Sequence, residues 1–222
     1  MKIRLQPILY FFTTVLILLG VMTIEGRFAT VVKEIKPQPV ITLQQHYFNK
    51  SRSVVLIRNT IGSLGAGFFI DTHTIATACH VVHDDAFVLV YKKGSEKALL
   101  GKVIAKSKDS DIAILTVATE QPNEYLKLTK RKQRVGDSVY TIGHPLGLKY
   151  SLSAGIISHV DRKTMSGELN GVIQIDAPIN GGNSGGPVFS KKGEVIGLVS
   201  YKGTGDGLGF VIPAKYITAM VK

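Results

Sequence analysis

The chain contains a single cysteine, Cys79, and no tryptophan. One cysteine cannot form an intrachain disulfide, which separates this chain from small secreted domains whose folds depend on disulfide frameworks. The fold must therefore be stabilised by the burial of apolar side chains. The chain has 222 residues, 45% of them hydrophobic and 19% charged, so it is long enough to bury a sizeable core without cross-links.

Acidic residues are scarce: 16 Asp and Glu stand against 27 Lys and Arg, which gives a formal net charge of +11. Such a balance can indicate binding to nucleic acid or to an anionic membrane surface. The densest basic run, residues 127–134, lacks the interleaved aromatic side chains of a single-strand binding surface. We interpret it as a solvated linker and expect no nucleic-acid partner. His46, His144 and His159 do not have metal-ligand spacing, so we expect no metal or other cofactor.

Long apolar runs are also rare, and one stands out near the start of the chain. It begins at Pro7, ends at Ile24 and carries no charge. A helix of this length, about 27 Å at ~1.5 Å per residue, is just enough to cross a bilayer core. Because no small-x-small cleavage site follows, we interpret residues 1–24 as an uncleaved membrane anchor, with a cleaved signal peptide as the alternative. Residues 25–50 would then tether a domain outside the cytoplasm, although the flanking basic residues do not decide the orientation.

From residue 51 onward, short apolar segments alternate with turns, a pattern that favours an all-β sandwich or barrel. The segments form two series, which indicates two similar lobes, barrel 1 at about 51–120 and barrel 2 at about 135–212. Ile217 and Val221 are four residues apart and predict a short helix at the end of the chain. The predicted strands are 53–58, 65–70, 74–77, 86–91, 99–104 and 112–117 in the first series, and 138–142, 150–160, 172–175, 195–200 and 209–212 in the second.

Three segments carry side chains suited to hydrolysis. His80 follows a strand, Asp111 precedes one, and Ser184 lies in the loop Asn-Gly-Gly-Asn-Ser-Gly-Gly-Pro. A serine hydroxyl is a weak nucleophile that needs a base, here His80, and a carboxylate, here Asp111, would orient that base. The chain order His, Asp, Ser is that of the chymotrypsin-like class and differs from the orders in subtilisins and α/β-hydrolases. The N–H groups of Gly182 and Ser184, on either side of Asn183, would form an oxyanion hole.

Neighbouring residues compete for these roles. Asp109 competes with Asp111, but Asp111 directly precedes the apolar strand, so its side chain can point into a cleft. His73 lies in a turn and His83 precedes two acidic residues, so we interpret both as surface residues. Cys79 is better explained as a small core residue than as the nucleophile, since a serine already fills that role.

These segments resemble the HtrA/DegP serine proteases of the chymotrypsin-like clan. The resemblance covers about residues 50–220 and includes 141–147, 153–158, 173–180 and 207–213 as well as the segments above. It implies a chymotrypsin-like double β-barrel, made of two six-stranded barrels, for residues 51–222, and it implies a homotrimer. That family usually continues into a PDZ domain, whereas this sequence stops at Lys222, so we expect a protease domain without PDZ control. His144 stands where the family often has Asn.

The same resemblance implies which residues build the primary specificity pocket. They are Pro178, Val199, Ser200, Tyr201 and Leu208. Enzymes of this class that select Lys or Arg carry an Asp six residues before the serine, and Pro178 stands at that offset here. Leu208 would narrow an apolar pocket, so we expect a preference for small or medium aliphatic side chains.

The sequence therefore predicts a serine endopeptidase that acts on unfolded or damaged proteins through an acyl-enzyme intermediate. Its partners would be protein or peptide substrates and a membrane, which would hold the domain on the periplasmic or lumenal side. Cleavage of the N-terminal segment would instead give a secreted protein. Two alternatives stay open: a processing protease with one dedicated substrate, and a catalytically silent binding protein that keeps the fold.

Overall fold

The computed structural model describes residues 41–119, 122–163 and 170–221. The predicted membrane anchor, from Pro7 to Ile24, and residues 25–40 of the predicted tether lie outside the described residues. No helix in the described part of the chain is long and apolar enough to cross a membrane.

A helix, α1 (Leu43–Lys50), leads into the first barrel and occupies the last part of the predicted tether. Thr42 begins it with a capping box: its hydroxyl accepts the N–H of Gln45 at 3.2 Å, and the Gln45 side chain accepts the N–H of Thr42 at 2.8 Å. His46 is buried, and its Nε2 lies 3.1 Å from the carbonyl oxygen of Lys191. Residues 43–50 are therefore packed against the folded domain.

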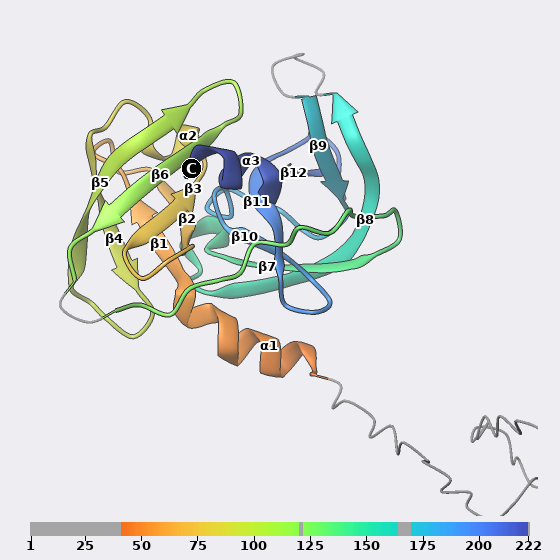
Figure 1. Cartoon of the computed structure of the whole chain (residues 1–222), viewed down its shortest axis with the longest axis horizontal. Helices are drawn as coiled ribbons and strands as arrows, with labels where there is room; N and C mark the ends of the chain where they lie inside the picture. Colours follow the sequence, from red (N-terminus) through yellow and green to blue (C-terminus); the bar gives the residue numbers. More distant parts are fainter. Residues whose placement is uncertain (1–40, 120–121, 164–169, 222) are drawn as a thin grey trace, which may run out of the picture. The chain divides into compact units, whose positions relative to one another are not determined.

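Six antiparallel strands close the first barrel in the order β1-β2-β3-β6-β5-β4 (Figure 1). Its interior is filled by fully buried side chains such as Ile57, Phe68, Ile75 and Leu115. The elements are η1 (Ser51–Ser53), β1 (Val54–Arg58), β2 (Leu64–Phe69), β3 (Thr74–Thr77), α2 (Cys79–Val82), β4 (Phe87–Lys92), β5 (Ala98–Ser107) and β6 (Ile112–Val117).

Six further antiparallel strands close the second barrel in the order β10-β11-β12-β9-β8-β7 (Figure 1). Ile157, Ile175 and Val211 are fully buried inside it, and Ile217 of the last helix is fully buried as well. The elements are β7 (Ser138–Gly143), η2 (Pro145–Gly147), β8 (Ser151–Lys163), β9 (Asn170–Ile175), β10 (Pro187–Ser190), β11 (Val195–Lys202), β12 (Gly209–Pro213) and α3 (Ala214–Met220).

The two closed six-stranded barrels and the short C-terminal helix confirm the predicted all-β, chymotrypsin-like architecture. One strand was missing from the prediction: β10 (Pro187–Ser190) belongs to the second series. It has four residues, begins with a proline directly after the glycine loop, and buries three side chains in succession. A four-residue segment that opens with proline after two glycines is typical of a loop, so its sequence did not indicate a strand.

Candidate active site

His80 lies in α2, the single helical turn that follows β3. This turn is anchored by the buried side chains of Val81 and Val82. The N–H of Cys79 donates to the carbonyl of Asp111 at 3.1 Å, which ties the backbone beside His80 to the turn before β6. The imidazole itself is 48% exposed and is therefore accessible from solvent.

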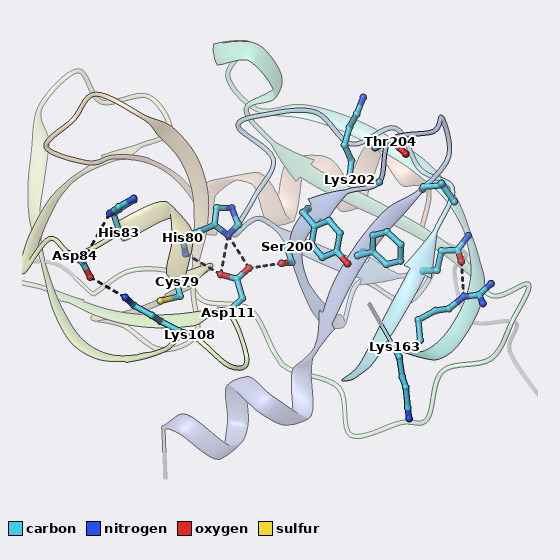
Figure 2. Close-up of a pocket in the computed structure, with 16 residues that line it drawn as sticks. Cys79, His80, His83, Asp84, Lys108, Asp111, Lys163, Ser200, Lys202 and Thr204 are labelled. Carbon is cyan, nitrogen blue, oxygen red and sulfur yellow. Dashed lines mark hydrogen bonds and ion pairs between the residues drawn. The ribbon is translucent and has the colours of Figure 1, made fainter. Parts of the chain in front are cut away.

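Asp111 is held directly against His80 (Figure 2). Its carboxylate accepts the His80 backbone N–H at 3.0 Å and faces Nδ1 of the ring, 2.9 Å from Oδ2. A carboxylate at Nδ1 selects the tautomer with its proton there, which leaves Nε2 as the acceptor. Burial raises the pKa of Asp111, but hydrogen bonds from His80 and Ser200 and the charge of His80 together hold it below its usual value. Asp111 is therefore ionised at neutral pH.

The backbone of Asp111 has a φ of 49°, in the left-handed region. Asp is one of the few side chains other than glycine that adopt this conformation with some frequency. The turn brings the carboxylate back over α2, which accounts for the two contacts with His80. Asp109, two residues earlier, is exposed and makes no ion pair among the described residues.

Ser184 lies on the loop between β9 and β10, and this loop is fastened to the first barrel. The carbonyl of Ser184 accepts the N–H of Ala66 in β2 at 2.8 Å. The next residue, Gly185, has a φ of +81°, and any side chain there would overlap the Ala66 carbonyl and the hydroxyl of Thr77. Only glycine fits at this contact, so the two barrels can meet directly behind Ser184.

The hydroxyl of Ser184 donates to the carbonyl of Ser200 in β11, at 2.9 Å. The Ser200 hydroxyl in turn donates to Oδ2 of Asp111 (Figure 2). Ser200 thus lies between Ser184 and the His80–Asp111 pair. In the described part of the chain the Ser184 hydroxyl has no hydrogen bond to His80.

The loop before Ser184 turns sharply at Gly182, whose φ is +97°. The N–H of Asn183 closes this turn by donating to the carbonyl of Asn180 at 3.0 Å. The backbone N–H of Asn183 is therefore not free to bind a ligand. Among the described residues, the N–H groups of Gly182 and Ser184 have no hydrogen-bond acceptor, and these two remain available.

A buried histidine, His144, holds this loop by a backbone hydrogen bond. The N–H of His144 donates to the carbonyl of Gly182 at 3.3 Å, and its ring is fully shielded from solvent. Nδ1 of His144 accepts the N–H of Tyr150 at 3.0 Å, while Nε2 has no hydrogen-bond partner. Burial lowers the pKa of His144 to about 4, so the ring is neutral at neutral pH.

A cavity of about 870 Å³ opens beside His80 and Asp111, between the two barrels (Figure 2). The rings of Tyr201 and Phe210 stack in its wall, with centroids 4.7 Å apart. The cavity is lined by Cys79, His80, His83, Asp84, Lys108 and Asp111 from the first barrel and by Arg162, Lys163, Gln174, Ser200, Tyr201, Lys202, Gly203, Thr204, Leu208 and Phe210 from the second. Nowhere in the described ranges do three or more His, Cys, Asp or Glu side chains group so that they could hold a metal ion.

This geometry agrees with a comparison against known protein families. Residues 65–198 match the family described as the trypsin-like peptidase domain, and this segment contains His80, Asp111 and Ser184. The chain belongs to the trypsin-like peptidase family.

Relatives of this trypsin-like peptidase include bacterial and plant proteins. The chain is 40% identical over 157 residues to the "Probable periplasmic serine endoprotease DegP-like" of Rhizobium meliloti, which covers 68% of this chain and 31% of the relative. It is 36% identical over 166 residues to "Protease Do-like 2, chloroplastic" of Arabidopsis thaliana, covering 70% of this chain and 27% of the relative. The chain thus spans about a third of the length of the curated relatives it matches.

Solved structures share the fold of this trypsin-like peptidase. The serine endoprotease from Yersinia pestis superposes with a TM-score of 0.71 at 27% identity, covering 83% of this chain and 65% of that chain. An inactive serine-to-alanine mutant of Rv3671c from M. tuberculosis H37Rv also has a TM-score of 0.71, at 25% identity, covering 84% of this chain and 93% of that chain.

The residues expected in the specificity pocket of this peptidase are only partly together. Ser200, Tyr201 and Leu208 line the cavity. Val199 is fully buried in the core of the second barrel and faces away from it, and Pro178 is exposed and lies outside its lining. Three of the five residues predicted for the pocket therefore line this cavity, and two do not.

Sequence reasoning missed three cationic residues of this wall: Arg162, Lys163 and Lys202. The first two end β8 and the third ends β11, and these strands are brought together through β9 and β12. Nothing local distinguishes them from the other basic residues along the chain. Their shared position depends on the pairing of four strands, which local sequence patterns do not encode.

Proposed function

We propose that this trypsin-like peptidase is an active serine endopeptidase in which Ser184 is the nucleophile, His80 the general base and Asp111 the residue that orients His80. The observation that carries the proposal is the unbroken set of hydrogen bonds from His80 through Asp111 and Ser200 to Ser184. The two unpaired N–H groups of Gly182 and Ser184 beside the serine hydroxyl support it further. Nucleophile, base, orienting carboxylate and anion donors then occupy one place, as acyl transfer requires.

The reaction begins when the Ser184 side chain rotates away from the Ser200 carbonyl toward His80. Because Asp111 occupies Nδ1 of His80, Nε2 is the nitrogen that accepts the hydroxyl proton. Catalytic hydrogen bonds are often loose without substrate and form only in the complex, so this rotation is a modest requirement. The Ser184 oxygen then adds to the carbonyl carbon of the scissile peptide bond, and the ionised Asp111 stabilises the imidazolium.

The negative charge that develops on the substrate oxygen is taken up by the N–H groups of Gly182 and Ser184. One such donor typically stabilises the transition state by roughly 3–4 kcal/mol. His80 then gives its proton to the leaving amine, and the C–N bond breaks to leave an acyl-enzyme on Ser184. Water, deprotonated by His80, hydrolyses this ester and regenerates the serine hydroxyl.

Labelling with a fluorophosphonate, which modifies an activated serine covalently, tests the assignment directly. We expect the wild-type protein to be labelled and to cleave casein, and the Ser184→Ala variant to do neither while keeping its circular dichroism spectrum. The matched control is Ser151→Ala, whose hydroxyl donates to Leu148 and lies outside the cavity lining. Casein hydrolysis by Ser184→Ala at the wild-type rate would refute the role of Ser184.

A catalytically silent binding protein is the second candidate, because the Ser184 hydroxyl is bonded to Ser200 rather than to His80. The same experiment separates the two functions. A folded wild-type protein that is neither labelled nor able to cleave casein would favour the binding protein. A dedicated processing protease would instead be labelled but would cleave few proteins in a proteome-wide comparison with Ser184→Ala.

We also propose that the substrates are unfolded or damaged proteins outside the cytoplasm, in keeping with the relative named as periplasmic. The membrane anchor from Pro7 to Ile24 and the homotrimer stay predictions. Alkaline carbonate extraction tests the anchor, since an apolar helix that spans the bilayer stays in the membrane pellet. A soluble product that begins after residue 24 would show a cleaved signal peptide instead.

A further inference from the structure

The cavity beside the proposed triad is strongly cationic. Four of its lining side chains are Lys or Arg, and two are carboxylates, Asp84 and Asp111. Asp111 is committed to His80 and Ser200. Asp84 is already matched by Lys106 at 3.2 Å and by Lys108 at 3.6 Å. No carboxylate of the cavity lining therefore balances the positive charges of the lining side chains from the second barrel.

Those cations are Arg162, Lys163 and Lys202. In the described ranges none of the three takes part in an ion pair. Arg162 donates from Nε to the side-chain oxygen of Gln174 at 3.0 Å, a neutral partner that leaves its charge unbalanced. Figure 2 shows Lys163 and Lys202 on the opposite side of the His80–Asp111 pair from Lys108. Charges of one sign in a concave surface concentrate oppositely charged ligands more effectively than scattered charges do.

The wall between these cations is apolar. Leu208 and the stacked rings of Tyr201 and Phe210 supply it. An apolar wall with cationic groups at its edge suits a side chain that has a short aliphatic stem and an anionic end, which describes Glu and Asp. Lys or Arg at the same place in a substrate would meet like charge.

We propose that this cleft selects polypeptides with Glu or Asp within a few residues of the scissile bond, and that Lys163 and Lys202, with Arg162, determine that selection. The inference rests on the proposed serine endopeptidase activity and names its substrate class. It concerns substrate positions near the scissile bond and stands beside the expectation that the primary pocket prefers small or medium aliphatic side chains. The net charge of +11 acts in the same direction by drawing acidic chains toward the protein.

The test compares fluorogenic peptides that differ only by Glu, Gln or Lys at successive positions on both sides of the cleaved bond. We expect wild type to cleave the best Glu peptide with a kcat/KM about 3- to 10-fold above that of its Gln counterpart, since each solvent-exposed ion pair contributes modestly. The ratio should approach one when the salt concentration rises from about 50 mM to about 0.5 M, because the charges are then screened. In K163Q/K202Q the preference should vanish, and in K163E/K202E it should turn toward the Lys peptide.

The matched control is K130E/K132E, which makes the same change in net charge at two exposed lysines outside the cavity lining. It should keep the Glu preference. Equal cleavage of Glu and Gln peptides by wild type, or a Glu preference that survives in K163E/K202E, would overturn the proposal. If K130E/K132E lost the Glu preference as fully as K163E/K202E, the preference would come from net charge. This result would overturn the role of the cleft.

Peptide binding to Ser184→Ala separates this inference from the proposed activity. Fluorescence anisotropy should show the labelled Glu peptide bound about 3- to 10-fold more tightly than the Gln peptide, with the same dependence on Lys163 and Lys202. Selective binding without any hydrolysis or fluorophosphonate labelling of wild type would refute the endopeptidase and keep the acidic ligand. Hydrolysis without selective binding would support the endopeptidase and refute the preference for acidic ligands.

Discussion

The hydroxyl of Ser200 donates a hydrogen bond to Oδ2 of Asp111, on the side of that carboxylate not used by the His80 backbone. Ser200 is almost fully buried, with 1% of its surface exposed, so this bond is protected from water. A hydrogen bond to an ionised group in such a place is among the stronger ones in proteins. In the proposed mechanism Ser200 is therefore a positioning residue, because it holds the carboxylate of Asp111 that orients His80.

Ser200→Ala should lower kcat by about 10-fold and leave KM for a short peptide nearly unchanged, because a bond to a charged group is worth roughly 1.5–3 kcal/mol and part of it is recovered by water. The Ser200 hydroxyl is one of the groups that hold the pKa of Asp111 down. Without this bond the Asp111 carboxylate is more basic and stabilises the protonated imidazole more strongly, so the acid limb of the pH–rate profile, which reports protonation of the base, should move to higher pH. Steady-state kinetics across pH measure both effects. Ser190→Ala, on the neighbouring strand β10, is the control, and an unchanged kcat for Ser200→Ala would remove Ser200 from the catalytic network.

Asp111→Asn should lower kcat by about 10⁴-fold without loss of fold, since an amide at this position favours the wrong tautomer of His80. The Asp109→Asn variant should retain wild-type turnover, because Asp109 is exposed and has no contact with the ring. Single-turnover cleavage of a fluorogenic peptide measures the two variants side by side. If Asp109→Asn proved to be the inactive variant, the orienting carboxylate would have been assigned to the wrong residue.

The sequence predicted those parts of the site whose signal is local. Asp111 precedes a strand and Ser184 stands among glycines, so each could be recognised from its immediate neighbours. Ser200 is one polar residue among others in its strand, and the sequence predicts it only as a pocket residue. Its contact with Asp111 joins residues 89 positions apart, and only the meeting of β11 with the turn before β6 creates it.

The same distinction between local and long-range signals explains which parts of the fold could be predicted. Strands with an apolar run of about four or more residues were predicted within a few residues, whereas β10 was missed because it is short and begins with a proline that continues the glycine loop. Arg162 and Lys202 belong to different strands of the second barrel and meet only through β9 and β12. Barrel closure and register are long-range properties, so the cationic wall of the cleft could not be read from composition.

Gly182→Ala should reduce kcat by about 10²-fold by displacing the proposed oxyanion donors. Its φ of +97° is strained for any side chain, and an added Cβ would overlap the carbonyl of His144. The adjacent Gly181→Ala is a close control, since a Cβ there meets nothing within 4 Å. Labelling by a fluorophosphonate, followed over time, reports the loss at the serine itself. Equal labelling rates for the two variants would show that the conformation at Gly182 does not matter for the reaction.

His144 should make the stability of the domain depend on pH in a range where carboxylates do not. Burial lowers its pKa to about 4, the Val55 backbone opposes this shift, and the nearby charge of Lys149 adds to it. In the unfolded chain a histidine titrates near pH 6.5, so between these values the unfolded state binds more protons than the folded state. Stability is therefore complete above about pH 6.5 and is lost progressively as the pH falls toward 4.

The free energy of unfolding should thus fall by about 2 kcal/mol between about pH 7.5 and pH 5, as measured by urea denaturation at each pH. His144→Asn should flatten this part of the curve, because an asparagine does not titrate and its side-chain oxygen can still accept the N–H of Tyr150. Asp111, whose pKa lies below its usual value, contributes stability that is lost only as the pH falls through the acidic range below this window. A wild-type curve that is flat from pH 7.5 to 5, or one as steep in His144→Asn as in wild type, would contradict a neutral, buried imidazole at His144.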